Sequence, residues 1–136
     1  MAGYSGTPLP KKLGIKQGHK VAAISAPSGF IKSLGALPSG VLIEAKYSLR
    51  SQFDVIVSFV TSRAQLKREV AAARSHMTAA AGFWIAWPKK ASGVATDVTE
   101  DVVREVALPT GLVDNKVCAI DEIWSGLRLV IRKELR

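Results

Sequence analysis

The chain has 136 residues, of which 48% are hydrophobic, so it is long and apolar enough for one domain with a buried core, and a disordered chain is excluded. No apolar run reaches the length of about 20 residues that crosses a bilayer, and the single cysteine, Cys118, excludes a disulfide framework within the chain. The formal net charge is +8, and residues 1–50 carry seven Lys or Arg against Glu44 alone, which indicates either an anionic partner or ordinary solubility charge.

Residues 1–13 are expected to form a loose amino-terminal arm on a single domain that spans 1–136. Residues 4–10 are rich in Gly, Ser, Thr and Pro, which favour irregular structure, although 10–13 could make one helical turn that Gly14 ends. No apolar signal region begins the chain, so a cytoplasmic protein is expected.

Two short strands and one short helix are predicted next. The small apolar residues 20–26 and the residues 41–45 each have the composition of a short strand bounded by turn residues. Between them, Ser28 is expected to cap a short helix that buries Phe30 and Ile31 on one face.

The middle of the chain carries the clearest signals. Residues 53–60, FDVIVSFV, form a nearly continuous β-branched run that predicts a strand buried on both faces. Ser62 and Gln65 have the spacing of a capping box, and helical spacing of apolar residues then predicts a helix over about 63–79. The apolar residues of that helix are Leu66, Val70, Ala73 and Met77. The run 83–87, FWIAW, predicts the next strand.

A second helix and two strands complete the chain. Thr99 is expected to cap a helix that has an acidic first turn and that Pro109 ends. The runs 112–120 and 126–134 predict an antiparallel pair, which adds one antiparallel strand at the edge of the sheet. The alternation of strands and helices predicts an α/β fold, a three-layer Rossmann-like domain with a mostly parallel sheet and a carboxyl-terminal antiparallel hairpin.

This order, above all its carboxyl half, resembles the class I S-adenosylmethionine-dependent methyltransferases. FDVIVSFV is similar to the family's central fourth strand, AAGFWIAWPK to its fifth strand, and residues 112–134 to its closing hairpin. The segment LGIKQGHKVAAISAPSG is similar to the entry into its first strand. The resemblance implies a methyltransferase-type fold, with S-adenosylmethionine as the candidate cofactor. Residues 50–134 also resemble a family of small bacterial proteins with a shared strand–PK–G–helix layout, and that likeness implies no function.

The loop after the first predicted strand departs from the methyltransferase pattern. The family has a glycine-rich loop there, because only glycine lets the backbone approach the cofactor closely. The matching loop SAPSGF has one glycine, Gly29, and Pro27 removes a backbone donor. Glu44 stands near the position of the acid that holds the cofactor's ribose in the family, and the family's third strand has no clear counterpart. These departures imply a reduced version of the fold.

Six residues are predicted to lie at the carboxyl edge of the sheet, where open parallel sheets bind ligands. Small side chains after the first strand let a ligand come close, and the lysines of WPKK neutralise an anion. A plain strand–helix turn and a solvated loop are the structural alternatives. The six residues are Ser25, Ser28, Gly29, Thr61, Lys89 and Lys90. Glu44 joins them if the ligand is S-adenosylmethionine.

Three functions are compatible with these observations. The first is a non-catalytic module that binds a small anionic or nucleotide-like ligand, or a protein partner, at this edge. The second is an S-adenosylmethionine-dependent methyltransferase with an atypical loop, since methyl transfer can depend mainly on positioning. The third is a basic nucleic-acid-binding accessory protein whose affinity falls steeply with salt. The lysines of that third hypothesis are Lys11, Lys12, Lys16 and Lys20.

Two further side chains are singled out by their surroundings. Trp124 stands in the predicted hairpin turn beside two acids, where a partly exposed aromatic favours a protein-partner or homo-oligomer contact. Cys118 alternates with apolar neighbours and is expected in the core. The two histidines have no partners at metal-binding spacing, so no metal site is predicted.

Overall fold

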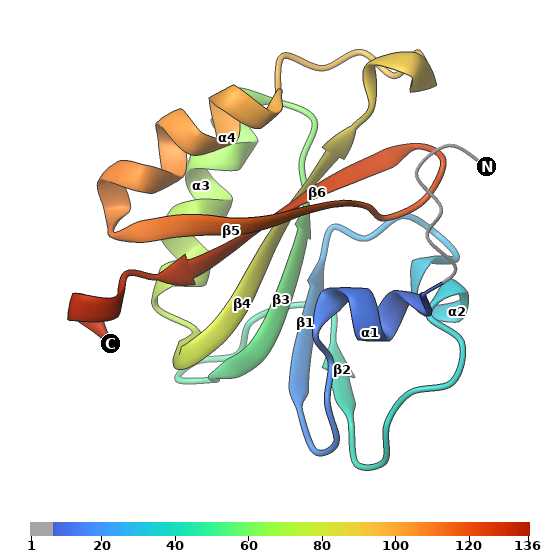
Figure 1. The fold of residues 1–136 in the computed structure, drawn as a ribbon, viewed down its shortest axis with the longest axis vertical. Coiled ribbons are helices and arrows are strands. Elements are labelled where there is room, and N and C mark those ends of the chain that lie inside the picture. Colours follow the sequence, from blue (N-terminus) through green and yellow to red (C-terminus); the bar gives the residue numbers. More distant parts are fainter. Residues whose placement is uncertain (1–6) are drawn as a thin grey trace.

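The computed structural model describes residues 7–136, which form a six-stranded sheet with helices on both faces (Figure 1). The strands are β1 (Lys20–Ile24), β2 (Leu42–Glu44), β3 (Phe53–Phe59), β4 (Met77–Pro88), β5 (Leu112–Ala119) and β6 (Trp124–Ile131). The helices are α1 (Leu9–Leu13), α2 (Phe30–Ser33), α3 (Arg63–Arg74) and α4 (Glu100–Ala107). The predicted α/β fold with a mostly parallel sheet and a closing hairpin is confirmed.

The strand order is β2-β1-β3-β4-β6-β5, and the first four strands in that order are parallel. β6 runs antiparallel to both of its neighbours, β4 and β5. The prediction that the antiparallel strand lies at the edge is therefore wrong, because β6 lies inside the sheet. The reason is the composition of the two strands: β5 carries the exposed Asn115, Lys116 and Val117, which suit an edge, whereas most of β6 is buried.

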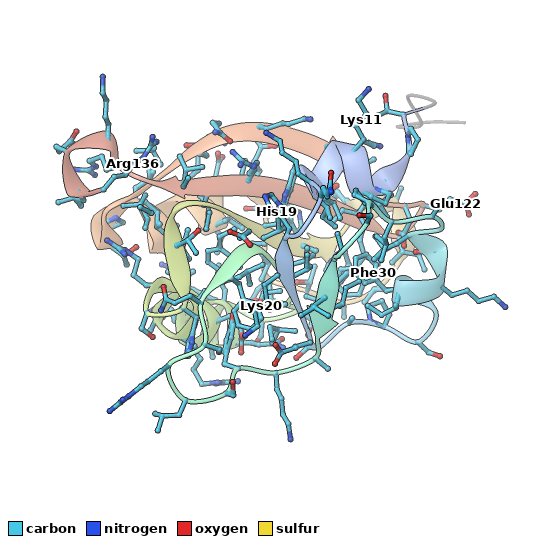
Figure 2. The ribbon with its side chains drawn as sticks, turned by 90° about the horizontal axis from the view of Figure 1, so that it is seen from below. Lys11, His19, Lys20, Phe30, Glu122 and Arg136 are labelled. Atoms are coloured by element: carbon cyan, nitrogen blue, oxygen red, sulfur yellow. The ribbon has the colours of Figure 1, made fainter. Side chains whose placement is uncertain are left out.

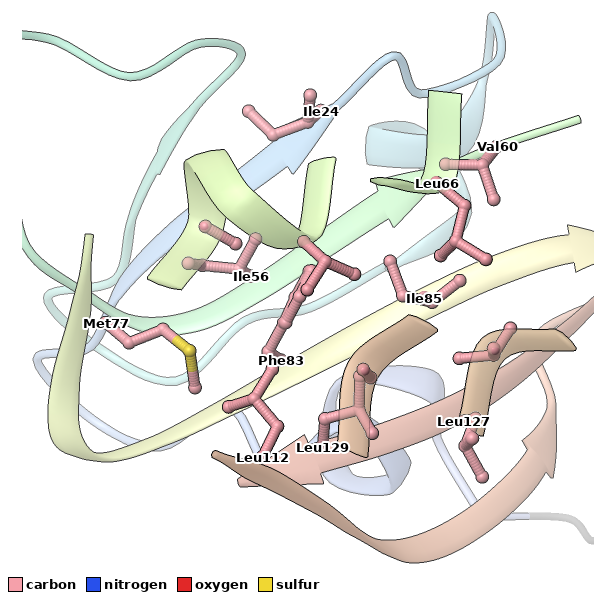
Figure 3. Packing of buried hydrophobic residues seen from close by; sticks show 14 of the residues in the cluster. Ile24, Ile56, Val60, Leu66, Met77, Phe83, Ile85, Leu112, Leu127 and Leu129 are labelled. Carbon is pink, nitrogen blue, oxygen red and sulfur yellow. The ribbon is translucent and has the colours of Figure 1, made fainter. Parts of the chain in front are cut away.

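The two faces of the sheet bury separate apolar clusters. α3 and α4 cover one face, where Leu66, Phe83 and Leu129 are fully buried (Figure 3). α1 and α2 cover the other face, where Trp84 packs in the second cluster. Each large apolar side chain that is fully buried contributes roughly 1.5–3 kcal/mol to the free energy of unfolding. Burial on both faces explains why β3 and β4 are apolar along nearly their whole length.

The residues of α1 pack on the sheet, which corrects the prediction of a loose arm for the part of it that is described. Leu13 is fully buried, and its carbonyl oxygen accepts a hydrogen bond of 3.0 Å from Trp84 Nε1. Gly14 ends the helix in the left-handed conformation, as the sequence predicts. Residues 1–6 of the predicted arm lie outside the described residues.

α3 begins as predicted but ends earlier. Ser62 Oγ accepts a hydrogen bond of 3.1 Å from the amide of Gln65, which confirms the cap. The helix ends at Arg74, and Met77, predicted to lie in the helix, is the first residue of β4. Met77 pairs in register with Phe53 of β3, so strand pairing overrides the helical spacing there.

α2 also differs from its prediction. Gly29, with a φ of 88°, occupies the cap position, and no side chain caps the helix, so the expected role of Ser28 as the cap is wrong. Phe30 is buried, whereas Ile31 is 47% exposed. A helix of four residues presents one narrow face to the sheet, and adjacent residues point about 100° apart around its axis.

The segment between β2 and β3 has no counterpart of the methyltransferase third strand. Residues 45–52 run as a loop in which the ring of Tyr47 stacks on that of His76, with 4.4 Å between ring centroids. Thr99 caps α4 as predicted, since its Oγ1 accepts a hydrogen bond from the amide of Val102. Within residues 7–136, no helix has the length and apolar character that a membrane span requires.

Candidate ligand site at the carboxyl edge of the sheet

The strand order reverses between β1 and β3. The chain moves from β1 outward to β2, and from β3 in the opposite direction to β4. The loops that follow β1 and β3 therefore diverge to opposite faces of the sheet and leave a crevice position at its carboxyl edge. Ser25, Thr61 and Lys89 follow the ends of β1, β3 and β4, so the structure brings the predicted residues to this one edge.

The β1–α2 loop has two residues in the left-handed conformation. Ser25 has a φ of 55° and Gly29 a φ of 88°. Glycine adopts this conformation without strain, but a serine there costs about 1–2 kcal/mol. Ser25, Ser28 and Gly29 are all exposed. The strained residue lies in the crevice position, which is where such strain usually accompanies a function.

The end of β3 is closed by the loop between β4 and α4. The backbone amide of Thr61 donates to Gln65 Oε1 at 3.0 Å, and its carbonyl oxygen accepts from Thr96 Oγ1 at 2.6 Å. Asp97 Oδ1 accepts a hydrogen bond of 2.7 Å from the amide of Arg63, the first residue of α3. Only the exposed side chain of Thr61 is left to face a ligand. Sequence reasoning missed Thr96 and Asp97, because nothing local indicates that their loop folds back over β3.

Lys89 and Lys90 lie in a turn after β4 that hydrogen bonds hold in place. The amide of Lys89 donates to the carbonyl oxygen of Ile123 in the hairpin at 2.7 Å, and Ser92 Oγ donates to the carbonyl oxygen of Lys89 at 2.7 Å. Lys89 is half-buried and Lys90 is exposed. The backbone of this turn is fixed, so the two ammonium groups stay near the carboxyl edge while the long side chains keep their freedom.

Glu44 is not grouped with the other candidates. It pairs in register with Ala22, three residues before Ser25, so it lies roughly 10 Å below the edge along the strand direction. Its Oε2 lies 3.2 Å from Lys20 Nζ, and the two side chains are 37% and 35% exposed. Glu44, the acid that the sequence assigns to a ligand's ribose, is therefore neutralised by a lysine.

Three aromatic rings pack beneath the edge. Phe59 meets Phe30 at 4.8 Å and Trp124 at 5.0 Å between ring centroids, both edge to face. Trp124 is the first residue of β6 and half-buried, which corrects its predicted place in the hairpin turn. The rings give the β1–α2 loop a rigid apolar base. Sequence reasoning missed this cluster because its members come from three distant segments.

The arrangement of strands and helices matches solved methyltransferase structures. Fibrillarin from Methanococcus jannaschii, a pre-rRNA processing protein, aligns with 93% of this chain over 69% of its own, with a TM-score of 0.64 and 13% identity. A SAM-dependent methyltransferase from Aquifex aeolicus aligns with 89% of this chain over 87% of its own, again with a TM-score of 0.64 and 13% identity.

A ribosomal protein L11 methylase from Lactobacillus delbrueckii subsp. bulgaricus gives a TM-score of 0.62 at 12% identity, over 91% of this chain and 75% of its own. No family model and no curated protein sequence matches the chain. These likenesses show a class I S-adenosylmethionine-dependent methyltransferase-type Rossmann fold, and at such identities they show the fold alone.

The residues present fit poorly with S-adenosylmethionine, the cofactor that this fold implies. An acid that holds ribose hydroxyls must present a free carboxylate at the edge, whereas Glu44 lies below it and is paired with Lys20. The loop after β1 carries side chains at Ser25 and Ser28, where the cofactor needs a close backbone approach.

Proposed function

We propose that this chain is a non-catalytic module that binds a small anionic, nucleotide-like ligand at the carboxyl edge of β1, β3 and β4. The observation that carries the proposal is the left-handed Ser25 at the point where the strand order reverses. A strained, exposed serine in a crevice position is costly for folding, so its presence there favours a use in binding.

The charge of the edge favours an anion. Lys89 and Lys90 extend from the fixed turn that follows β4, two strands from β1 at the carboxyl edge, and neither forms an ion pair with an acid among residues 7–136. Two carboxylates of this region accept hydrogen bonds from backbone amides: Asp97 from Arg63, and Asp121, in the hairpin loop next to Lys89, from Ile123 and Trp124. Lysine binds phosphate as a point charge without strict geometry, which suits two flexible side chains on a fixed backbone.

S-adenosylmethionine-dependent methyl transfer is the second candidate. Its support is the fold, which this chain shares with the Aquifex aeolicus SAM-dependent methyltransferase over 89% of its length. Against it stand the paired Glu44 and the side chains in the loop after β1. Methyl transfer needs a bound, oriented cofactor more than a catalytic acid or base, so cofactor binding decides between the two candidates.

Calorimetry with ADP, S-adenosylmethionine and S-adenosylhomocysteine tests the proposal. ADP is expected to bind, and the variant K89Q/K90Q is expected to weaken that binding about tenfold, or 1.4 kcal/mol. The matched control is K67Q/R68Q, which removes the same charge from exposed positions on α3. If ADP does not bind, or if K89Q/K90Q binds ADP with unchanged affinity, the proposal of an anion-binding module is wrong. Micromolar binding of S-adenosylmethionine, about −8 kcal/mol, would favour the second candidate in its place.

A further inference from the structure

A groove of about 460 Å³ lies between α1 and the edge strand β5, and it shares no residue with the carboxyl-edge site. Its lining comes from α1, from β5 and from Thr7 just before α1, and consists of Thr7, Lys11, Lys12, Lys116, Val117, Cys118 and Ala119. Three of these seven residues are lysines, and none is an acid. The volume is within the range of small-ligand sites, but its position on an open sheet edge lets a longer ligand pass through it.

The lysines of the groove are not neutralised by acids. Lys12 Nζ donates to the carbonyl oxygen of Ala119 at 2.9 Å, and Lys116 Nζ donates to the carbonyl oxygen of Lys12 at 3.3 Å. Within residues 7–136, no ion pair with Asp or Glu involves Lys11, Lys12 or Lys116. A neutral carbonyl group orients an ammonium ion but does not cancel its charge. An anionic ligand in the groove would supply the missing negative charge.

The positive charge continues along β6. Lys116 stands directly opposite Arg128 in the β5–β6 ladder, and like charges at such a position destabilise a sheet. The Arg128 guanidinium is partly buried, and its burial and the nearby Arg136 lower its pKa. The nearest acids in sequence, Asp114 and Glu134, pair with Arg104 and Arg132 instead. This concentration of charge costs stability, and neither Lys116 nor Arg128 forms an ion pair with an acid among residues 7–136.

The five cations form one continuous feature, which we call the basic track: Lys11, Lys12, Lys116, Arg128 and Arg136. Figure 2 shows Lys11 and Arg136 near the two ends of the same side of the molecule, with Lys20 away from that side. The strand beneath the track, β5, has eight residues and is therefore about 25 Å long. A ligand that meets all five cations must carry several negative charges over that length.

We infer that the basic track binds the phosphate backbone of a nucleic-acid strand. A repeated anion at regular spacing matches a line of cations better than one small nucleotide does. A peptide that pairs with the edge of β5 is disfavoured, because Lys12 occupies the outward carbonyl oxygen of Ala119 and a charged lysine on an edge blocks strand addition. The inference is independent of the proposed function, since the two sites lie on different elements.

Fluorescence anisotropy with a labelled single-stranded RNA of 12 nucleotides tests the inference. The variant K11Q/K116Q, which changes two exposed side chains, is expected to weaken binding at least tenfold at about 0.1 M salt. The slope of log affinity against log salt is expected to fall by about 1.4, because each lost phosphate contact in a single strand removes about 0.7. K67Q/R68Q is the matched control and should change the affinity less than twofold.

Two competitors separate the remaining outcomes. Polyglutamate of matched charge should compete poorly; equal competition would mean that any acidic chain, including a protein partner, is the ligand and would overturn the inference. Inorganic pyrophosphate should displace the RNA only at much higher concentration. No RNA binding, or equal losses in K11Q/K116Q and K67Q/R68Q, would also overturn it. As a second readout, RNA is expected to slow alkylation of Cys118, which lines the groove.

Discussion

Lys20 and Glu44 face each other across β1 and β2, with Nζ and Oε2 3.2 Å apart, and Lys20 Nζ also lies 5.0 Å from the centre of the Phe53 ring. This pair bears on two predictions made from the sequence. Glu44 does not present a free carboxylate to the carboxyl edge, and Lys20 does not join the lysines of the basic track. The sequence assigns Glu44 to S-adenosylmethionine and Lys20 to a nucleic acid, whereas in the structure the two side chains pair with each other.

Replacing Glu44 with Ala is expected to leave ADP binding within twofold, because the carboxylate lies below the edge and is already paired. The cost in unfolding free energy should stay under about 1 kcal/mol, since both side chains are more than a third exposed and water screens the pair. Calorimetry and urea unfolding measure the two effects. Loss of ADP binding in E44A, with the fold intact, would place Glu44 in the site after all.

The change of Gly82 to Ala should be unfavourable only while Arg128 is present. A Cβ at Gly82 would lie 2.6 Å from Arg128 Nε, so the guanidinium must move away from Asn115, whose Oδ1 it now meets at 3.3 Å. We expect G82A to cost about 1 kcal/mol in the wild type and to be neutral or stabilising in an R128A background, because glycine weakens a strand interior. A double-mutant cycle by urea unfolding checks this, and equal costs in both backgrounds would contradict it.

Replacing Ser25 with Gly should stabilise the fold by roughly 0.5–1 kcal/mol. Glycine removes the cost of a left-handed serine, and the greater entropy of its unfolded chain offsets only part of that gain. If the hydroxyl contacts the ligand, ADP binding should weaken in the same variant. S25A is the control: it keeps the strain, so it should lose binding without gaining stability. Unchanged stability in S25G would show that the loop is not strained.

The bond from Trp84 to Leu13 fixes α1 on the sheet. In W84F the carbonyl oxygen of Leu13 loses its buried donor and the fully buried site loses volume, so unfolding free energy should fall by about 2–3 kcal/mol. Hydrogen exchange should accelerate in residues 7–15. W87F removes a similar volume on the opposite face and should leave exchange in α1 unchanged. Equal acceleration in both variants would mean that the bond has no local role.

Stability should fall at high pH through Tyr47. Burial and the Glu69 carboxylate raise the pKa of the Tyr47 phenol above its ordinary value. The unfolded chain loses that proton near pH 10 while the folded chain keeps it, so the unfolded state binds fewer protons and unfolding becomes easier as pH rises.

The variant Y47F isolates this effect. It removes a buried hydroxyl that lies near Ser58 but makes no hydrogen bond within 3.5 Å among residues 7–136, so at neutral pH it should be neutral or stabilising. Between about pH 9 and 11, Y47F should lose less stability than the wild type. Parallel urea titrations of both proteins measure the difference, and identical pH profiles would rule out Tyr47 as the titrating group.

Capping residues in the sequence correctly predicted those helix ends that are fixed by contacts between neighbouring residues. Ser62 caps α3, Thr99 caps α4 and Gly14 ends α1, because each makes contacts within a few residues of itself. The same logic failed where a distant strand decides. Met77 continues the apolar spacing of a helix, but pairing with Phe53 draws it into β4.

The sequence by itself determined the fold class and the edge at which Ser25, Thr61, Lys89 and Lys90 lie, because alternating strands and helices with right-handed crossovers leave few ways to wind a parallel sheet. Only the tertiary structure decided which charged side chains form ion pairs and which do not. Charge pairing depends on distances of a few ångströms between segments far apart in the chain, and β-strand register fixes those distances. The strand register brings Lys20 to Glu44 and places Lys116 opposite Arg128, and no local sequence pattern predicts either relationship.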